Sequence, residues 1–172
     1  MVKKLIYIML MVLLLGSCQN QNKYEQVIAR ADSLMESNQD SARAALVMLD
    51  GLKSHEASMG KHDQMYYQLI YAKGMNKGFV DFTTDSVMKQ VVAYYDKHGS
   101  ANDRMLVYYL LGCVYRDLKD SPASLASYNK AVECADTTSA DCNYDLLAIV
   151  NGQIGFFAFG SRYAQTSIRG IG

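Results

Sequence analysis

The sequence has few of the features that indicate strands or disorder. Among its 172 residues there is one Pro and no Trp, and no stretch shows sustained alternation of apolar and polar residues. Without that alternation half-buried strands are not expected, and an apolar content of 50% argues against a disordered chain. With 13 Tyr residues supplying aromatic volume, the composition predicts a packed, all-α protein.

The apolar run near the start is too short to span a bilayer. It covers residues 5–15, whereas a spanning helix needs about 20 apolar residues. Because Lys3-Lys4 precedes this run and small residues follow it, residues 1–17 are predicted to be a secretory signal peptide. The ending Leu15-Gly16-Ser17-Cys18 resembles the bacterial lipobox, which implies lipidation of Cys18 and cleavage just before it. An ordinary signal peptide with an unrelated Cys is the alternative.

The chain also lacks an excess of basic charge. Removing Lys3 and Lys4 from the 17 basic residues leaves 15 against 17 acidic residues. This balance offers no basic face of the size that phosphate backbones require, so no nucleic acid partner is expected for this chain. The residue after the lipidation site is Gln19. An Asp at that position would resemble the signal that retains lipoproteins in the inner membrane of some bacteria, and Gln19 does not fit it. A lipid-anchored protein of the bacterial envelope, in the outer membrane, is therefore predicted.

Residues 103–136 have the most specific spacing in the chain. Two helical runs flank a break at residues 119–122, and Gly112 lies in the first run. Ser100 with Asp103 fits a capping box, and Ser121-Pro122 fits a helix start. The spacing predicts two helices folded back to back, with the small Gly112 allowing a close approach. An ordinary helical hairpin in a bundle is the alternative.

This stretch resembles the tetratricopeptide repeat, a helix-turn-helix unit of about 34 residues. The positions that the family fills with aromatic, Leu, small or Ala residues are occupied here by Tyr108, Leu111, Gly112, Tyr115, Ser124, Tyr128 and Ala131. Asp136 stands where the family closes the unit with Pro. The resemblance implies an all-α fold of antiparallel helix pairs, stacked as a short right-handed superhelix, in which these side chains are buried.

The resemblance also implies a binding surface for a protein or peptide. In the family the first helices of the repeats line a concave groove, and here Tyr109, Cys113 and Arg116 would face it. Tyr and Arg are suited to recognition because they offer flat apolar area and a forked donor. Arg116 is the one basic residue at these positions, so capture of a free C-terminal carboxylate is not expected. Tyr109 and Arg116 as a solvated pair without a ligand is the alternative.

Further helices are predicted on both sides of the clear repeat. They cover residues 23–37, 41–52, 62–76, 85–98 and 144–157, with Asp40 as the N-cap of the second and Gly78 and Gly99 as stop signals. We expect one repeat domain over residues 18–157. Residues 158–172 show no helical period and are predicted to form an irregular tail, which suggests a shortened or frame-shifted chain; a natural end is the alternative.

No residue pattern indicates catalysis, a cofactor or a metal. His55-Glu56 begins like a zinc-protease motif, but Met59 stands where the second His is required. The Ser-x-x-Lys spacing occurs three times without the motifs that accompany it in penicillin-binding enzymes. The chain is therefore not expected to be an enzyme.

Three cysteines remain after Cys18, and two of them are close in sequence. Cys134 and Cys142 flank a predicted loop, so a disulfide between them is possible in an oxidising envelope. Reduced cysteines packed in the helices are the commoner outcome.

These observations favour an envelope lipoprotein that acts as a protein-interaction scaffold, similar to the repeat-bearing lipoproteins common in Bacteroidota. One alternative is the shortened sensor part of a membrane-linked transcriptional regulator with such repeats. A second is a glycan-binding outer-membrane lipoprotein, an idea weakened by the lack of Trp.

Overall fold

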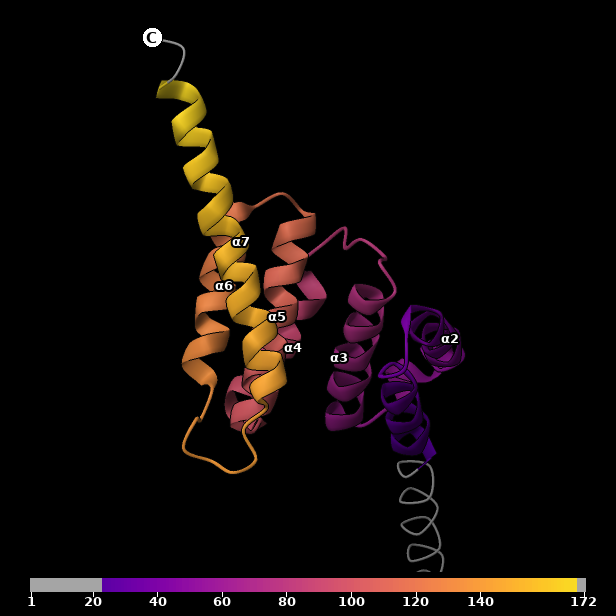
Figure 1. The fold of residues 1–172 in the computed structure, drawn as a ribbon. Coiled ribbons are helices and arrows are strands. Elements are labelled where there is room, and N and C mark those ends of the chain that lie inside the picture. The colour runs from indigo at the N-terminus through magenta and orange to yellow at the C-terminus, as the bar shows by residue number, and fades with distance from the viewer. Residues whose placement is uncertain (1–22, 170–172) are drawn as a thin grey trace, which may run out of the picture. The chain divides into compact units, whose positions relative to one another are not determined.

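The computed structural model describes residues 23–169, except for the side chains of residue 39 and residues 158–169. A helix over residues 23–34 comes first, followed by α2 (Gln39–Asp50), the 3-10 helix η1 (Lys53–Ser58), α3 (Lys61–Lys77), α4 (Ser86–His98), α5 (Ala101–Asp117), α6 (Ser121–Cys134) and α7 (Tyr144–Arg169) (Figure 1). No strand occurs within 23–169, and the all-α class is confirmed for this range. The predicted signal peptide and Cys18 lie outside the described residues.

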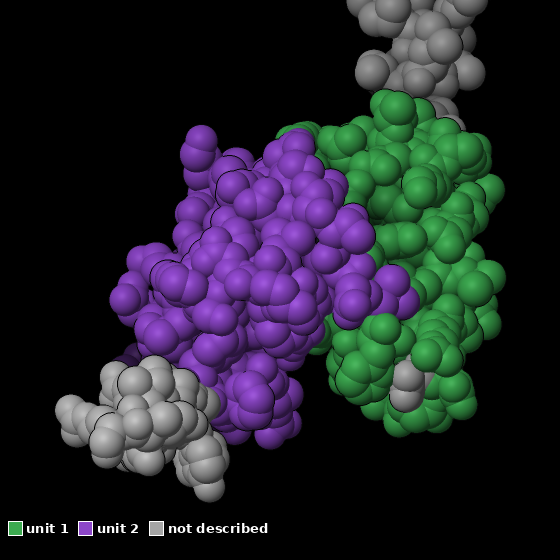
Figure 2. Space-filling model, turned by 90° about the horizontal axis from the view of Figure 1, so that it is seen from above, with its two compact units in different colours: residues 1–79 green, residues 80–172 purple. Residues whose placement is uncertain are grey.

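The chain divides into two compact units, Met1–Phe79 and Val80–Gly172, shown in green and purple in Figure 2. The sequence predicted one domain over residues 18–157, and this division differs from it. Phe79 has a φ of 55°, a left-handed conformation rare for an aromatic residue, and directly follows Gly78, the C-cap of α3. Gly78 and Gly99 both follow the last residues of their helices, as predicted.

The first unit has an apolar core drawn from all three of its α-helices. The buried apolar residues are Ile28, Ala31, Met35, Ala42, Ala45, Leu46, Leu49, Met59, Met65, Tyr67, Leu69, Ile70 and Ala72. The N-cap of α2 is Asn38, whose Oδ1 accepts a hydrogen bond from the backbone N–H of Ser41 at 2.9 Å, so the prediction of Asp40 was wrong. Asn and Asp are about equally good N-cap residues, so the local sequence could not decide between Asn38 and Asp40.

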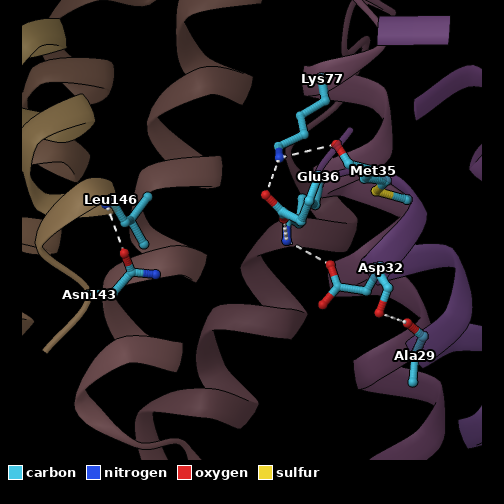
Figure 3. Close-up of polar contacts among 9 residues, drawn as sticks. Ala29, Asp32, Met35, Glu36, Lys77, Asn143 and Leu146 are labelled. Atoms are coloured by element: carbon cyan, nitrogen blue, oxygen red, sulfur yellow. Dashed lines mark hydrogen bonds and ion pairs between the residues drawn. The ribbon is translucent and has the colours of Figure 1, made fainter. Parts of the chain in front are cut away.

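A network of ion pairs ties the first helix of this unit to α3. Lys73 Nζ lies 2.6 Å from Asp32 Oδ1 and 2.7 Å from Glu36 Oε1, and Lys77 Nζ lies 2.9 Å from Glu36 Oε2. Figure 3 shows Lys77, Glu36 and Asp32 in this network, with Lys77 also donating to the carbonyl of Met35. Hydrogen bonds from the two lysines hold the pKa of Glu36 below its ordinary value.

Helix α5 is the centre of the second unit. It packs against α4 and α6, its chain neighbours, and also against α7 (Figure 1). The predicted capping box is confirmed: Ser100 Oγ accepts from the N–H of Asp103, and the Asp103 carboxylate accepts from the N–H of Ser100. The box fixes the start of α5, and only Gly99 and Ser100 separate it from the end of α4.

A short turn connects α5 to α6. Lys119 has a φ of 64°, and Asp120 follows as the N-cap, with Oδ1 accepting from the N–H of Ala123 at 3.0 Å. Pro122 lies in the first turn of α6, where a missing N–H costs no hydrogen bond. A break was predicted at residues 119–122; the structure has it at residues 118–120, with Ser121 and Pro122 already in α6. Because the connection is so short, the two helices are antiparallel neighbours.

The irregular tail predicted over residues 158–172 is contradicted as far as residue 169. The backbone of α7 continues as helix to Arg169, and residues 170–172 lie outside the described range. Residues 158–169 contain no Pro and a single Gly, and an isolated Gly costs about 1 kcal/mol without ending a helix. The missing apolar period was therefore weak evidence against a helix.

Candidate binding face on helix α5

The helix pair α5–α6 is built on a contact between Gly112 and Tyr128. A Cβ atom added to Gly112 would lie 2.4 Å from Tyr128 Cε1 and 2.5 Å from its Cδ1, so only Gly fits beneath the ring. Ser124, one turn before Tyr128, donates its hydroxyl hydrogen to the carbonyl oxygen of Gly112 at 2.8 Å. Leu111, Gly112, Ser124, Tyr128 and Ala131 are all buried, as the sequence predicted.

Tyr128 joins three helices of the second unit. Its side chain is 0% exposed, its hydroxyl donates to Cys113 Sγ at 3.6 Å, and its ring lies 6.0 Å from that of Tyr109 and 6.1 Å from that of Phe157 of α7. Burial raises the pKa of the Tyr128 hydroxyl. The ring is therefore held from several sides and has little room to move.

The prediction that Cys113 faces a groove was wrong. Its side chain is 0% exposed, and burial raises the pKa of its thiol. The reason is that α5 is covered by three helices, so its buried side is wider than the stripe expected for a helix with one exposed face. The candidate binding face is reduced to the other two predicted residues, Tyr109 and Arg116.

Tyr109 and Arg116 are both half-buried on α5. The guanidinium of Arg116 is paired with Asp117: Nε donates to Oδ1 at 2.9 Å, and Nη2 lies 2.9 Å from the same oxygen. Asp117 Oδ2 in turn accepts from the backbone N–H of Phe82 at 3.2 Å. Asp117 therefore neutralises part of the charge of Arg116 and holds its guanidinium in place. The candidate binding face combines this guanidinium with the aromatic ring of Tyr109.

Tyr108 and Tyr115 are half-buried, although both were predicted to be buried. The Tyr108 hydroxyl donates to Asp96 Oδ2 at 3.0 Å. Burial, together with this hydrogen bond, raises the pKa of Tyr108 to about 12. The ring supplies apolar contact while its polar tip stays near water, a common compromise for Tyr that a repeat pattern does not encode.

Sequence reasoning missed two polar clamps and one close contact. Asn102 of α5 donates to the carbonyl of Asp141 at 2.7 Å and accepts from the N–H of Asn143 at 3.0 Å, which fastens the loop between α6 and α7. Asn143 also accepts from the N–H of Leu146 (Figure 3). In the first unit, a Cβ at Gly74 would lie 2.8 Å from Met35 Cε. No short-range signal reveals the contacts of Asn102 with its partners or of Gly74 with Met35, because they join residues 39 or more positions apart in the sequence.

The described part of the chain contains no disulfide and no cluster suited to a metal. Cys113, Cys134 and Cys142 are free thiols, so the possible Cys134–Cys142 disulfide is not formed in this structure. No group of three or more His, Cys, Asp or Glu side chains within residues 23–169 is placed to hold a metal ion. Among these same residues, no helix has the length and apolar character needed to cross a membrane.

Comparison of the chain with protein-family models, with curated proteins and with solved structures finds no match.

Proposed function

We propose that this chain is a lipid-anchored protein of the bacterial envelope that acts as a helical-repeat scaffold. Its protein partners would bind to α5. The observation that carries the proposal is the contact of α5 and α6 at Gly112, with the Tyr128 ring over the glycine and Ser124 on its carbonyl. These are the small and aromatic positions through which the stretch over residues 103–136 resembles the tetratricopeptide repeat. The proposal includes stacking of the helix pairs as a short right-handed superhelix.

The partner-binding face in this proposal contains Tyr109 and Arg116. They lie about two helical turns apart on α5 and are both partly accessible. A half-buried Tyr and a guanidinium held by Asp117 lose little side-chain freedom on binding, which favours recognition of a protein or peptide surface. Acylated Cys18 would hold the chain at the outer membrane, and the partner would then be another envelope protein.

A photo-crosslinking residue at position 109 tests the proposal in cells. The matched control carries the same residue at position 129, because Asn129 is exposed on α6 and lies outside the candidate face. Position 108 is a poor buried control, since Tyr108 is half-buried and bonded to Asp96. Mass spectrometry of the N-terminal peptide would establish acylation of Cys18 in the same preparation.

The expected result is a higher-mass adduct from position 109 that is absent from position 129, in a protein acylated at Cys18. The crosslinked species would identify the partner. An acylated protein that gives no adduct at 109, or equal adducts at both positions, would contradict the binding face. Absence of acylation would contradict the anchor separately.

A further inference from the structure

Residues 151 and 152 form the sequence Asn-Gly, which occurs once among the 172 residues. The backbone nitrogen that follows an Asn can attack the side-chain amide of that Asn, and a Gly in the second position lacks the Cβ that would obstruct this ring closure. Every other Asn of the chain is followed by a residue with a side chain. The sequence therefore marks Asn151 as the amide that loses ammonia most readily.

The structure leaves this pair open to water. Asn151 and Gly152 are both exposed on α7, and a Cβ added to Gly152 would meet no atom within 4 Å. The same holds for Gly155, three residues further along the helix. Two glycines so close together also weaken α7 locally, because Gly is a poor helix former. Solvent and free space are therefore available to the reaction once the backbone leaves its helical conformation.

The helix opposes the reaction for as long as α7 is intact. Asn151 Nδ2 donates to the carbonyl oxygen of Leu147 at 3.0 Å, which holds the side-chain amide against the preceding turn. In an α-helix the N–H of Gly152 is likewise committed to the carbonyl four residues before it. The attacking nitrogen and the leaving nitrogen are thus both held by hydrogen bonds, and local opening of α7 has to come first.

A change of the backbone at residue 151 would reach the core of the second unit. Leu146 and Val150 are buried on the side of α7 that packs against α6 and α5. About two turns beyond Val150, the ring of Phe157 lies 6.1 Å from the buried ring of Tyr128. Asn151 lies between these contacts, so an unbroken helix at this residue is what brings Phe157 to Tyr128.

We propose that Asn151 is a site of spontaneous conversion to isoaspartate, which the helical state of α7 suppresses and which, once formed, separates the C-terminal part of α7 from Tyr128. The nitrogen of Gly152 forms a bond to Cγ of Asn151, the Cγ–Nδ2 bond breaks, and Nδ2 leaves as ammonia with the proton of the Gly152 N–H. Water then opens the cyclic imide, at the backbone carbonyl carbon to give isoaspartate or at Cγ to give aspartate. This inference does not depend on the function proposed above.

The two products differ in what they do to the helix. In isoaspartate the main chain passes through the former side chain and gains a methylene group, so the regular hydrogen bonds of α7 cannot continue across residue 151. Aspartate keeps the ordinary backbone and adds only a charge. The variant Asn151→Asp therefore reproduces the new charge, and the loss of the bond to Leu147, without the backbone change.

The experiment incubates the full chain at mildly alkaline pH, in buffer and in guanidinium chloride that unfolds it. Peptide mapping by mass spectrometry follows each Asn, and labelling by an isoaspartyl methyltransferase identifies isoaspartate. Asn129, exposed on α6 and followed by Lys130, is the internal control. Gly152→Ala is the matched variant, since its Cβ meets no atom within 4 Å. Converted protein is then purified and returned to buffer, and its urea midpoint is compared with that of Asn151→Asp.

In denaturant, Asn151 should convert faster than Asn129 by about tenfold or more, and Gly152→Ala should remove this difference. Folding should slow the conversion of Asn151 by about tenfold or more, because α7 must open first. The isoaspartate form should have a lower urea midpoint than Asn151→Asp, or fail to refold where Asn151→Asp refolds.

Three results would overturn the proposal. Equal rates at Asn151 and Asn129 in denaturant would remove the site, and equal rates at Asn151 in the folded and unfolded chain would remove the protection by α7. An isoaspartate form as stable as Asn151→Asp would show that the change at residue 151 does not reach Tyr128. Gly152→Ala taken through the same incubation should keep its urea midpoint, which excludes damage elsewhere in the chain as the cause of a loss.

Discussion

Replacing Gly112 by Ala should destabilise the protein, although Ala is the better helix former. The new methyl group would lie 2.4 Å from Tyr128 Cε1, well inside van der Waals contact. The ring is fully buried and bordered by Cys113 and Phe157, so it cannot move aside without disturbing α7. The substitution therefore forces α5 and α6 apart.

The magnitude follows from three opposing contributions. Overpacking a well-filled core costs about 1–3 kcal/mol, and weakening the hydrogen bond from Ser124 to the Gly112 carbonyl costs about 1 kcal/mol. Removing a glycine from a helix interior returns about 1 kcal/mol. We expect a net loss of about 2 kcal/mol in the free energy of unfolding, which lowers the urea midpoint by about 1 M for an m-value near 2 kcal/mol/M.

The assay is urea unfolding of the full chain, followed by circular dichroism at 222 nm. Gly152→Ala is the matched control, because it adds the same methyl group to a helix where no atom lies within 4 Å. This variant should be more stable than the unchanged chain by up to about 1 kcal/mol. The reasoning would be refuted if Gly112→Ala were as stable as the unchanged chain, or if the two substitutions shifted the midpoint in the same direction by similar amounts.

Two further predictions concern the first unit. Gly74→Ala should change the free energy of unfolding by less than about 1 kcal/mol, because the added methyl would meet the flexible side chains of Met35 and Leu46, which can shift. A loss as large as that of Gly112→Ala in the same urea assay would contradict this. Asp63 is buried, and its Oδ2 has no hydrogen-bond partner among the described residues. Burial raises the pKa of its carboxyl above the ordinary 3.8, so folding takes up a proton and stability falls as the pH rises through the window just above 3.8. Asp63→Asn should therefore raise the thermal midpoint at neutral pH and flatten its fall above that window; an unchanged pH profile would count against it.

Local sequence signals predicted most helix limits to within a few residues. Gly78, Gly99 and the Ser100–Asp103 capping box act through the backbone of their own turn, so their effect does not depend on distant parts of the chain. The error at Asn38 arose where two good capping residues stand two positions apart. The helix over residues 158–169 was missed because a segment without Pro can continue a helix even when it shows no apolar period.

The candidate site was harder to predict, because it depends on how many neighbours a helix has. Cys113 was assigned to a groove from a repeat position, yet α7 and α6 enclose that part of α5. The contact of Tyr128 with Phe157 joins residues far apart in sequence, and nothing in the local spacing indicates it. Tyr109 and Arg116 are each partly exposed to solvent. A periodic sequence pattern separates buried from exposed positions, but it does not predict such intermediate exposure.

Gly112 and Gly152 show why spacing alone does not determine a role. Each lies inside a helix with apolar residues at neighbouring turns, and each presents helix surface without a side chain. One is covered by Tyr128, while the other meets no atom within 4 Å among the described residues. A glycine in a helix permits close packing at a cost of about 1 kcal/mol in helix stability, and a bound neighbour is what offsets that cost. At Gly112 that neighbour is α6, whereas at Gly152 no described residue supplies one, so the same residue type stabilises a helix contact in one place and only weakens a helix in the other.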